Sequence, residues 1–271
     1  MQTLAVFLGP YRNLTTLTAA VLSLHPEVQV LNHAVDRLWA KDTDTNFIDS
    51  PDDATLQRFM ATAVEASADG QRGTQGGHIL HSHAFDDPHM RELYIRRYGD
   101  VRVKEGFKAL VWKESMKVQR RFMRSPGAFN RVCEELPNVK FVLPLRRPLD
   151  CALSNIRTKH AHTMDLPPDA SIGQAVTRVL DVFAWGLQRR DKRPERVFAF
   201  TQAQDPQQVF RDLAAFLGIS PEERWLADVK EGFVVRPSRP APAKIVEMTN
   251  KAIDAKLERW PEIGKALHSA A

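Results

Sequence analysis

The pattern of apolar and polar positions divides this chain into alternating strands and helices, beginning close to its first residue. Residues 4–8 form an unbroken apolar run, typical of a strand that is buried on both faces, and Gly9-Pro10 ends it. Across residues 14–24 the apolar positions then recur at helical spacing. The chain therefore leaves a buried strand through a short turn and enters a helix.

The same alternation continues along the chain. It predicts further strands over 27–33, 107–113, 140–145 and 196–201, and helices over 55–68, 89–98, 117–135, 180–190, 207–217 and 244–259, with a break in the 117–135 helix at Ser125-Pro126-Gly127. We expect Asp150 to cap a helix after the 140–145 strand and Asp205-Pro206 to start the 207–217 helix. Strands and helices that alternate in this way predict an α/β fold, with a central parallel sheet covered by helices on both faces.

Composition limits the kind of molecule without identifying it. The chain has 271 residues, of which 43% are hydrophobic and 26% charged, so we expect a single domain over 1–271, with 36–90 as a loop or helical elaboration. Lys and Arg outnumber Asp and Glu by 38 to 33 without a dense basic block, which suits a small anionic ligand and gives no indication of nucleic-acid binding.

The cysteines and the apolar runs indicate in which cellular compartment the protein is expected. Cys133 and Cys151 form no CxxC pair, which favours a reducing compartment and a site without metal. No apolar run approaches the roughly 20 residues of a membrane span, and the first residues lead directly into a core strand. We expect a cytoplasmic protein.

The turn after the first strand has the character of an anion site. The first backbone N–H groups of a helix have no partner within the helix, and the helix dipole adds positive potential there. Arg12 places a cation in this turn, and Thr15 and Thr16 place hydroxyls at the start of the helix. Residues 9–16 are therefore predicted to hold a phosphate or sulfate group.

A second stretch repeats this arrangement. The 140–145 strand is followed by Arg146-Arg147-Pro148 and then by a helix that carries Ser154. If the helix turns back over the sheet, Arg146 and Ser154 meet on one side and form a second anion site, distinct from the first.

Several further side chains stand at strand ends, where ligands gather in open α/β sheets. His33 follows the second strand and Lys113 ends the third. His81 and His83 alternate along a segment that we expect to be extended, in a stretch with four histidines among twelve residues. This stretch is open to three interpretations: exposed loop histidines, a metal site, or a base or substrate contact.

Together, the two anion sites resemble those of the sulfotransferases that use 3'-phosphoadenosine-5'-phosphosulfate (PAPS). Their PRSGTT loop corresponds to Pro10-Tyr-Arg12-Asn13-Leu14-Thr15-Thr16, with one residue added, and their R-x-P-x-D-x-x-x-S motif corresponds without a gap to 146–154. Residues 197–218 also look like the late strand and the "DP…L…FLG" helix of that family. The resemblance implies a P-loop-like α/β architecture and a sulfuryl transfer from PAPS, in line, to a hydroxyl or amine.

The resemblance also assigns roles to the candidate residues. It implies that Arg12, Asn13, Leu14, Thr15 and Thr16 hold the phosphosulfate. Arg146 and Ser154 would hold the 3'-phosphate, and Arg12 and Lys113 would stabilise the leaving group. His33 and His83 are alternative bases, and no metal is implied.

Two positions depart from the family loop, since Leu14 stands for its glycine and Asn13 for its serine. This leaves a second function open, that of a nucleotide-binding but non-catalytic relative. A phosphotransferase is a third possibility, although the loop lacks the Gly-Lys-Ser/Thr of GxxxxGK[ST]. The acceptor, a small molecule or a saccharide, and the oligomeric state are not encoded in any motif. The basic loop with Arg236 and Arg239 resembles the family's nucleotide-closing segment only loosely.

Overall fold

The computed structural model describes residues 2–39, 44–73, 75–236 and 240–269; Arg239 lies outside them. Its centre is a six-stranded sheet in the order β3-β2-β4-β1-β5-β6. The strands are β1 (Thr3–Phe7), β2 (Val28–Asn32), β3 (Gly77–His78), β4 (Ala109–Lys113), β5 (Val139–Leu145) and β6 (Val197–Thr201). All neighbouring pairs are parallel except β2 with the short edge strand β3. The predicted α/β class is confirmed.

The apolar runs form strands because both faces of the sheet are covered. Along β1, Leu4 and Val6 contact one hydrophobic cluster, and Ala5 and Phe7 contact the other. The first cluster lies under α3 (Asp53–Ala68), α5 (Met116–Arg124), α6 (Ala128–Glu135) and α8 (Ile172–Lys192), and the second under α1 (Thr15–Leu22), α4 (Pro88–Tyr98), α9 (Pro206–Leu217) and α10 (Glu223–Gly232). Alternate side chains of each strand therefore serve opposite layers.

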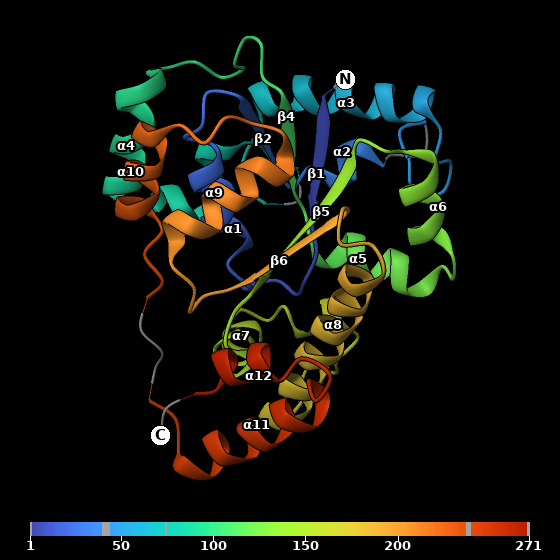
Figure 1. Ribbon diagram of the computed structural model, residues 1–271, viewed down its shortest axis with the longest axis vertical. Helices are drawn as coiled ribbons and strands as arrows, with labels where there is room; N and C mark the ends of the chain where they lie inside the picture. The colour runs from blue at the N-terminus through green and yellow to red at the C-terminus, as the bar shows by residue number, and fades with distance from the viewer. Residues whose placement is uncertain (1, 40–43, 74, 237–239, 270–271) are drawn as a thin grey trace.

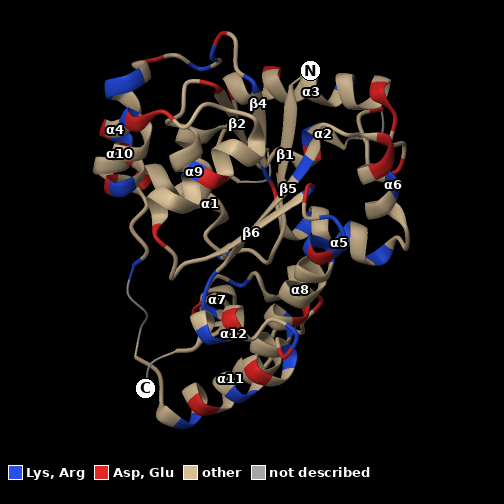
Figure 2. Cartoon of the chain, in the orientation of Figure 1, with Lys and Arg blue, Asp and Glu red and all other residues tan. Residues whose placement is uncertain are grey.

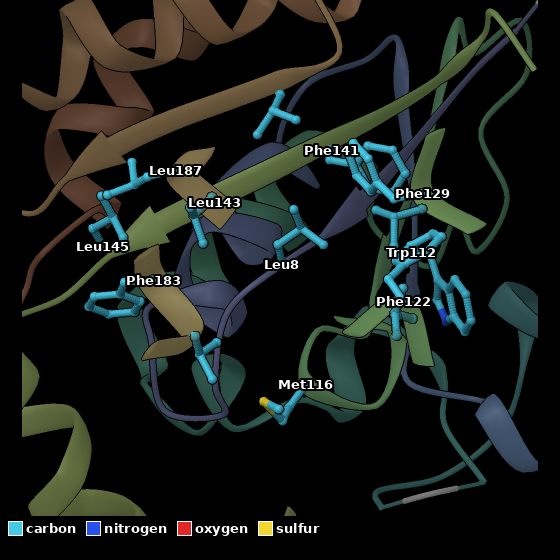
Figure 3. Close-up of a cluster of buried hydrophobic side chains, with 14 of the residues drawn as sticks. Leu8, Trp112, Met116, Phe122, Phe129, Phe141, Leu143, Leu145, Phe183 and Leu187 are labelled. Atoms are coloured by element: carbon cyan, nitrogen blue, oxygen red, sulfur yellow. The ribbon is translucent and has the colours of Figure 1, made fainter. Parts of the chain in front are cut away.

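Aromatic rings fill the first layer (Figure 3). Phe122, Phe129 and Phe141 come from α5, α6 and β5, with ring centroids 4.8–5.6 Å apart. On α8, Gly186 allows close approach to the sheet, because a Cβ there would lie 2.7 Å from a methyl carbon of Leu143. This packing fixes α5 and α8 against the strands whose ends carry the site.

Four further elements gather beyond the carboxyl ends of the strands (Figure 1). They are α7 (Pro148–Arg157), the 3-10 turn Ala161–Met164, α11 (Ala243–Lys256) and α12 (Pro261–Leu267). The short α2 (Val35–Leu38) follows β2, and the 3-10 turns Ile79–His81 and His83–Asp86 follow β3.

Several sequence predictions about local structure are corrected. Asp150 is not a cap: α7 begins at Pro148, with Arg147 as its N-cap residue, and Asp150 lies in the first turn. Since Pro is favoured in the first turn of a helix, it sets the N-cap three residues earlier than the carboxylate suggested. The predicted extended segment with His81 and His83 consists of 3-10 turns. Asp205 does cap α9, accepting a hydrogen bond from the Gln208 amide.

Candidate anion and proton-transfer site

The loops that follow β1, β2, β4 and β5 meet at one edge of the sheet. β1 lies between β4 and β5 in the sheet. The strands β2 and β4 therefore lie on one side of β1, and β5 and β6 lie on the other, so the strand order switches direction at β1. In open α/β sheets such a switch of strand order creates a crevice at the carboxyl ends of the strands. The predicted residues on these four loops, from Arg12 to Arg146, are therefore brought to one region.

The turn between β1 and α1 exposes the start of the helix. The first intrahelical hydrogen bond runs from the Thr18 amide to the Leu14 carbonyl, at 2.9 Å. The amides of Thr15, Thr16 and Leu17 precede it and have no partner further back in the helix. Leu14 is the N-cap residue with φ 63° and provides no side-chain cap, so these donors are directed to whatever lies in front of α1.

Asn13 joins this turn to the end of β5. Its side chain is fully buried; the Oδ1 atom accepts from the Arg146 amide at 2.9 Å, and the Nδ2 group donates to the Pro144 carbonyl. Both polar groups of the amide are therefore used within the protein. Asn13 was predicted to contact the cofactor. Since its side chain is already hydrogen-bonded within the protein, only its backbone N–H is left for such a contact.

Arginine side chains from the two predicted anion sites converge. The Nε–H of Arg12 donates to the Ser154 hydroxyl at 3.0 Å, and Arg146 donates to the Arg12 carbonyl at 3.3 Å. The two sites are thus adjacent and not separate. Figure 2 shows basic residues in blue along the segment that leads from β5 into α7.

Arg157 adds a third guanidinium. Burial lowers the pKa of Arg12 first, and the charges of Arg146 and Arg157 lower it further. Within the described ranges none of these three arginines forms an ion pair with a carboxylate, and the Nε of Arg146 is buried without a hydrogen-bond partner. Cations that repel one another and lack carboxylates make a site suited to an anion with several oxygens.

A second group of polar side chains links the ends of β2 and β4. His33 Nδ1 lies 3.0 Å from Glu114 Oε2, and Lys113 Nζ lies 2.8 Å from His33 Nε2. The Tyr11 hydroxyl donates to Glu114 Oε1 at 2.7 Å. We call Tyr11, His33, Lys113 and Glu114 the histidine network.

Burial and charge shift the pKa values in this network. Burial would raise the pKa of Glu114, but hydrogen bonds from His33 and Tyr11 and the charge of Lys113 lower it to about 2. Burial lowers the pKa of Lys113 to about 8. The pKa of His33 is lowered by burial and by Lys113, so its imidazole is neutral at neutral pH.

His83 lies in a different environment from His33. Its side chain is 63% exposed, and its Nδ1 lies 3.3 Å from both Arg72 Nη1 and Asp86 Oδ2. Burial lowers the pKa of His160, and Arg12 lowers it further; His83 is among the nearby groups that contribute. The His160 ring in turn packs edge-on against Tyr11, with centroids 5.6 Å apart. His83 is therefore near the periphery of the same region, outside the histidine network.

Other features of the chain stand apart from this site. Among the described residues, no group of three or more His, Cys, Asp or Glu side chains could hold a metal ion, and no helix is both long and apolar enough to cross a membrane. Burial raises the pKa of Cys133 to about 11 and of Cys151 to about 12. A groove of about 460 Å³ lies at the amino ends of the strands, between β1 and α3, and contains none of the predicted site residues.

Some members of the site were missed in the sequence. Glu114 follows Lys113 directly at the strand end, and Tyr11 lies inside the loop motif. Arg157 lies three residues beyond Ser154, which is the spacing that places two helical residues on one face. Each of the three residues is therefore adjacent in sequence, or on the same helix face, to a predicted site residue.

The fold is that of an α/β protein with a candidate anion site at a topological switch point, and several solved structures are similar to it. The sulfotransferase from Alicyclobacillus acidocaldarius has 18% identity and a TM-score of 0.46, covering 98% of this chain and 96% of that chain. The sulfotransferase domain from the curacin biosynthetic pathway has 12% identity and a TM-score of 0.45, covering 93% and 97%.

Mouse sulfotransferase SULT7A1, solved in complex with PAP, has 11% identity and a TM-score of 0.46, covering 100% of this chain and 90% of that one. All three are sulfotransferases, the family that the motifs resemble. At these identities the similarity concerns the arrangement of the chain alone. No family model matches the sequence, and no curated protein matches it.

Proposed function

We propose that this protein is a sulfotransferase that moves a sulfuryl group from PAPS to a hydroxyl or amine of a small-molecule or saccharide acceptor. The observation that carries the proposal is the convergence of Arg12, Arg146 and Ser154 at the turn that leads into α1, with the charge of Arg157 near enough to lower the pKa of Arg12. In the part of the chain that the structure describes, no carboxylate forms an ion pair with these arginines. A cytoplasmic location stays a prediction from the sequence.

The residues present fit a nucleotide with phosphate groups at both ends. Thr15, Thr16 and the amides at the start of α1 are suited to the phosphosulfate, and Arg146 and Ser154 to the 3'-phosphate. The unpartnered Nε of Arg146 is one donor that a phosphate oxygen satisfies. PAPS, when bound, supplies the activated sulfuryl group.

The chain's own groups supply charge stabilisation and proton transfer. Arg12 and the loop amides offer donors where negative charge develops on a leaving phosphate, and Lys113 offers a buried cation on the neighbouring strand. His33 is the base we favour over His83, because it is neutral, held by Glu114, and lies at the end of β2 beside Lys113. An acceptor hydroxyl takes the place of Lys113 at His33 Nε2 before its proton moves.

A non-catalytic nucleotide-binding protein is the second candidate, and Leu14 is the observation that favours it. Leu14 has φ 63° at the position where the family loop has glycine, so a residue with a strained backbone stands where the family has a conformationally free one. The histidine network favours catalysis, since nucleotide binding alone does not require it. A phosphotransferase remains the third candidate.

Isothermal titration calorimetry with 3'-phosphoadenosine-5'-phosphate (PAP) tests the proposal. We expect binding to the unaltered protein and a loss of at least about tenfold in affinity in Arg146→Ala, because a charge-assisted contact contributes about 1.5–3 kcal/mol. Arg211→Ala is the matched control, since Arg211 pairs with Glu223 on the helix layer that covers α1, and it should bind PAP normally.

Other outcomes separate the candidates. A preference for ATP with Mg²⁺ over PAP would favour the phosphotransferase, and the absence of binding to either nucleotide would reject all three. Transfer of labelled sulfate to a panel of acceptors then separates an active enzyme from a non-catalytic relative. In an active enzyme, His33→Ala should lower transfer by more than about tenfold and His83→Ala by less; the opposite result would make His83 the base.

A further inference from the structure

The carboxylate of Glu114 has three donors and no free oxygen. Its Oε1 atom accepts from the Tyr11 hydroxyl at 2.7 Å and from the Ser115 amide at 3.1 Å, while Oε2 faces His33 Nδ1 at 3.0 Å. The Glu114 side chain is only 1% exposed. An ionised carboxylate in this position can only accept hydrogen bonds, so His33 Nδ1 must carry a hydrogen.

The backbone of His33 is held as firmly as its ring. Its amide donates to the Lys113 carbonyl at 3.2 Å, and its carbonyl accepts from Trp112 Nε1 at 2.6 Å. Both partners, Lys113 and Trp112, belong to β4. The Nζ of Lys113 also faces His33 Nε2. The ring is therefore placed against the end of β4 with one nitrogen toward the carboxylate and the other toward the ammonium group.

We propose that Glu114 is a positioning residue that fixes the tautomer of His33, with the hydrogen on Nδ1 and the proton-accepting lone pair on Nε2. This inference rests on the proposed function for its catalytic consequence, while the tautomer itself is independent of it. Glu114 touches no substrate in this scheme and acts through His33 alone.

The donors around Glu114 make the variant Glu114→Gln informative. The Ser115 amide can only donate, so the oxygen of the new amide is required on the side of Ser115 and Tyr11. The NH2 group then faces His33 Nδ1, which must accept, and the ring hydrogen moves to Nε2. That nitrogen can no longer accept a proton, and its hydrogen points at the donors of Lys113.

The experiment combines 15N-histidine NMR with kinetics at several pH values. In the unaltered protein we expect the His33 signals of an Nδ1–H tautomer, and in Glu114→Gln those of an Nε2–H tautomer. The variant should lose at least about a hundredfold in kcat, within the range for general-base catalysis, with KM and PAP affinity changed by less than about threefold.

The pH profile provides a readout that a purely structural role would not move. The groups that face His33 are Lys113 and Glu114 at the end of β4, Tyr11 from the β1–α1 turn, Lys117 on α5 and His160 near α7. In Glu114→Gln the rise of kcat with pH that belongs to His33 should be lost. Tyr11→Phe is the comparison variant, because it removes one donor to Glu114, keeps the carboxylate, and should retain the Nδ1–H tautomer.

Each failure has a separate meaning. An Nε2–H tautomer in the unaltered protein overturns the inference without any variant, even if Glu114→Gln does not fold. A reversed tautomer with unchanged kcat overturns the catalytic part. Absence of PAP binding rejects the proposed function and leaves the tautomer measurement intact.

Discussion

At the N-terminus of α1, Leu14 adopts a left-handed backbone conformation that is costly for a residue with a side chain. Its φ is 63°, yet the residue is only 9% exposed and its side chain packs in the core layer that contains α1. The conformation costs about 1–2 kcal/mol, whereas burial of a leucine side chain stabilises by about 1.5–3 kcal/mol. The burial therefore compensates for the backbone strain.

This balance predicts the effect of two substitutions at Leu14. Leu14→Ala should destabilise by about 2–5 kcal/mol, because it removes the buried side chain and keeps the strain. Leu14→Gly removes the same burial but relieves the strain, so it should be more stable than Leu14→Ala by about 1 kcal/mol. Urea unfolding measures both, and an alanine variant as stable as the glycine variant would contradict this account.

At the level of elements, the turn after β2 is supported by the loop that precedes β3. His33 and Ala34 both have positive φ, 56° and 67°. Gly76 lies against them so closely that a Cβ would come within 2.2 Å of the Ala34 amide nitrogen and of the Asn32 carbonyl oxygen. The position of the His33 backbone therefore depends on a glycine more than forty residues later.

Gly76→Ala should both destabilise the protein and impair catalysis. The strained φ of 59° alone costs about 1 kcal/mol, and the clash with two backbone atoms should raise the total above about 2 kcal/mol. Because the β2 turn must shift, sulfuryl transfer should fall as well. Thermal unfolding and the transfer assay measure these effects.

Gly73→Ala is the matched control for this prediction. Gly73 lies in the same loop and has φ 98°, but a Cβ there meets nothing within 4 Å. The Gly73→Ala variant should lose stability through backbone strain but keep its sulfuryl-transfer activity. Equal activity in the two alanine variants would mean that Gly76 does not support His33.

For the whole molecule, the histidine network couples stability to pH. The folded pKa of Glu114, about 2, lies below its ordinary value of 4.5. Its contribution is therefore complete above about pH 5 and is lost as the pH falls through 4.5 toward 2.

Acid unfolding of the unaltered protein and of Glu114→Gln checks this sign. A shift of this size corresponds to at most about 3 kcal/mol. The difference in unfolding free energy between the two proteins should shrink by up to that amount between about pH 5 and pH 2. Other carboxylates titrate in both proteins and cancel in the difference. A difference that stays constant over this range would contradict the low pKa of Glu114.

Local patterns predicted most of the elements because they depend on nearby residues. The continuous run of β1 and the capped start of α9 were confirmed, as was the interruption between α5 and α6 at residues 125–127. The helix α10, in which Trp225, Leu226 and Val229 are buried at helical spacing, was missed, and so was α12. Pro148 and Asp150 compete for the start of α7, and only the folded chain shows that Pro148 sets it.

The sequence alone determined the α/β class, the order of strands and helices, and the two arginine-containing turns, since hydrophobic period and turn residues act over short distances. The tertiary structure decided which side chains meet. It placed Ser154 beside Arg12, used Asn13 to join the turn to β5, and set Glu114 between Tyr11 and His33. These contacts span from 81 to 142 residues of chain, and they form because parallel packing brings the carboxyl ends of distant strands to one edge of the sheet.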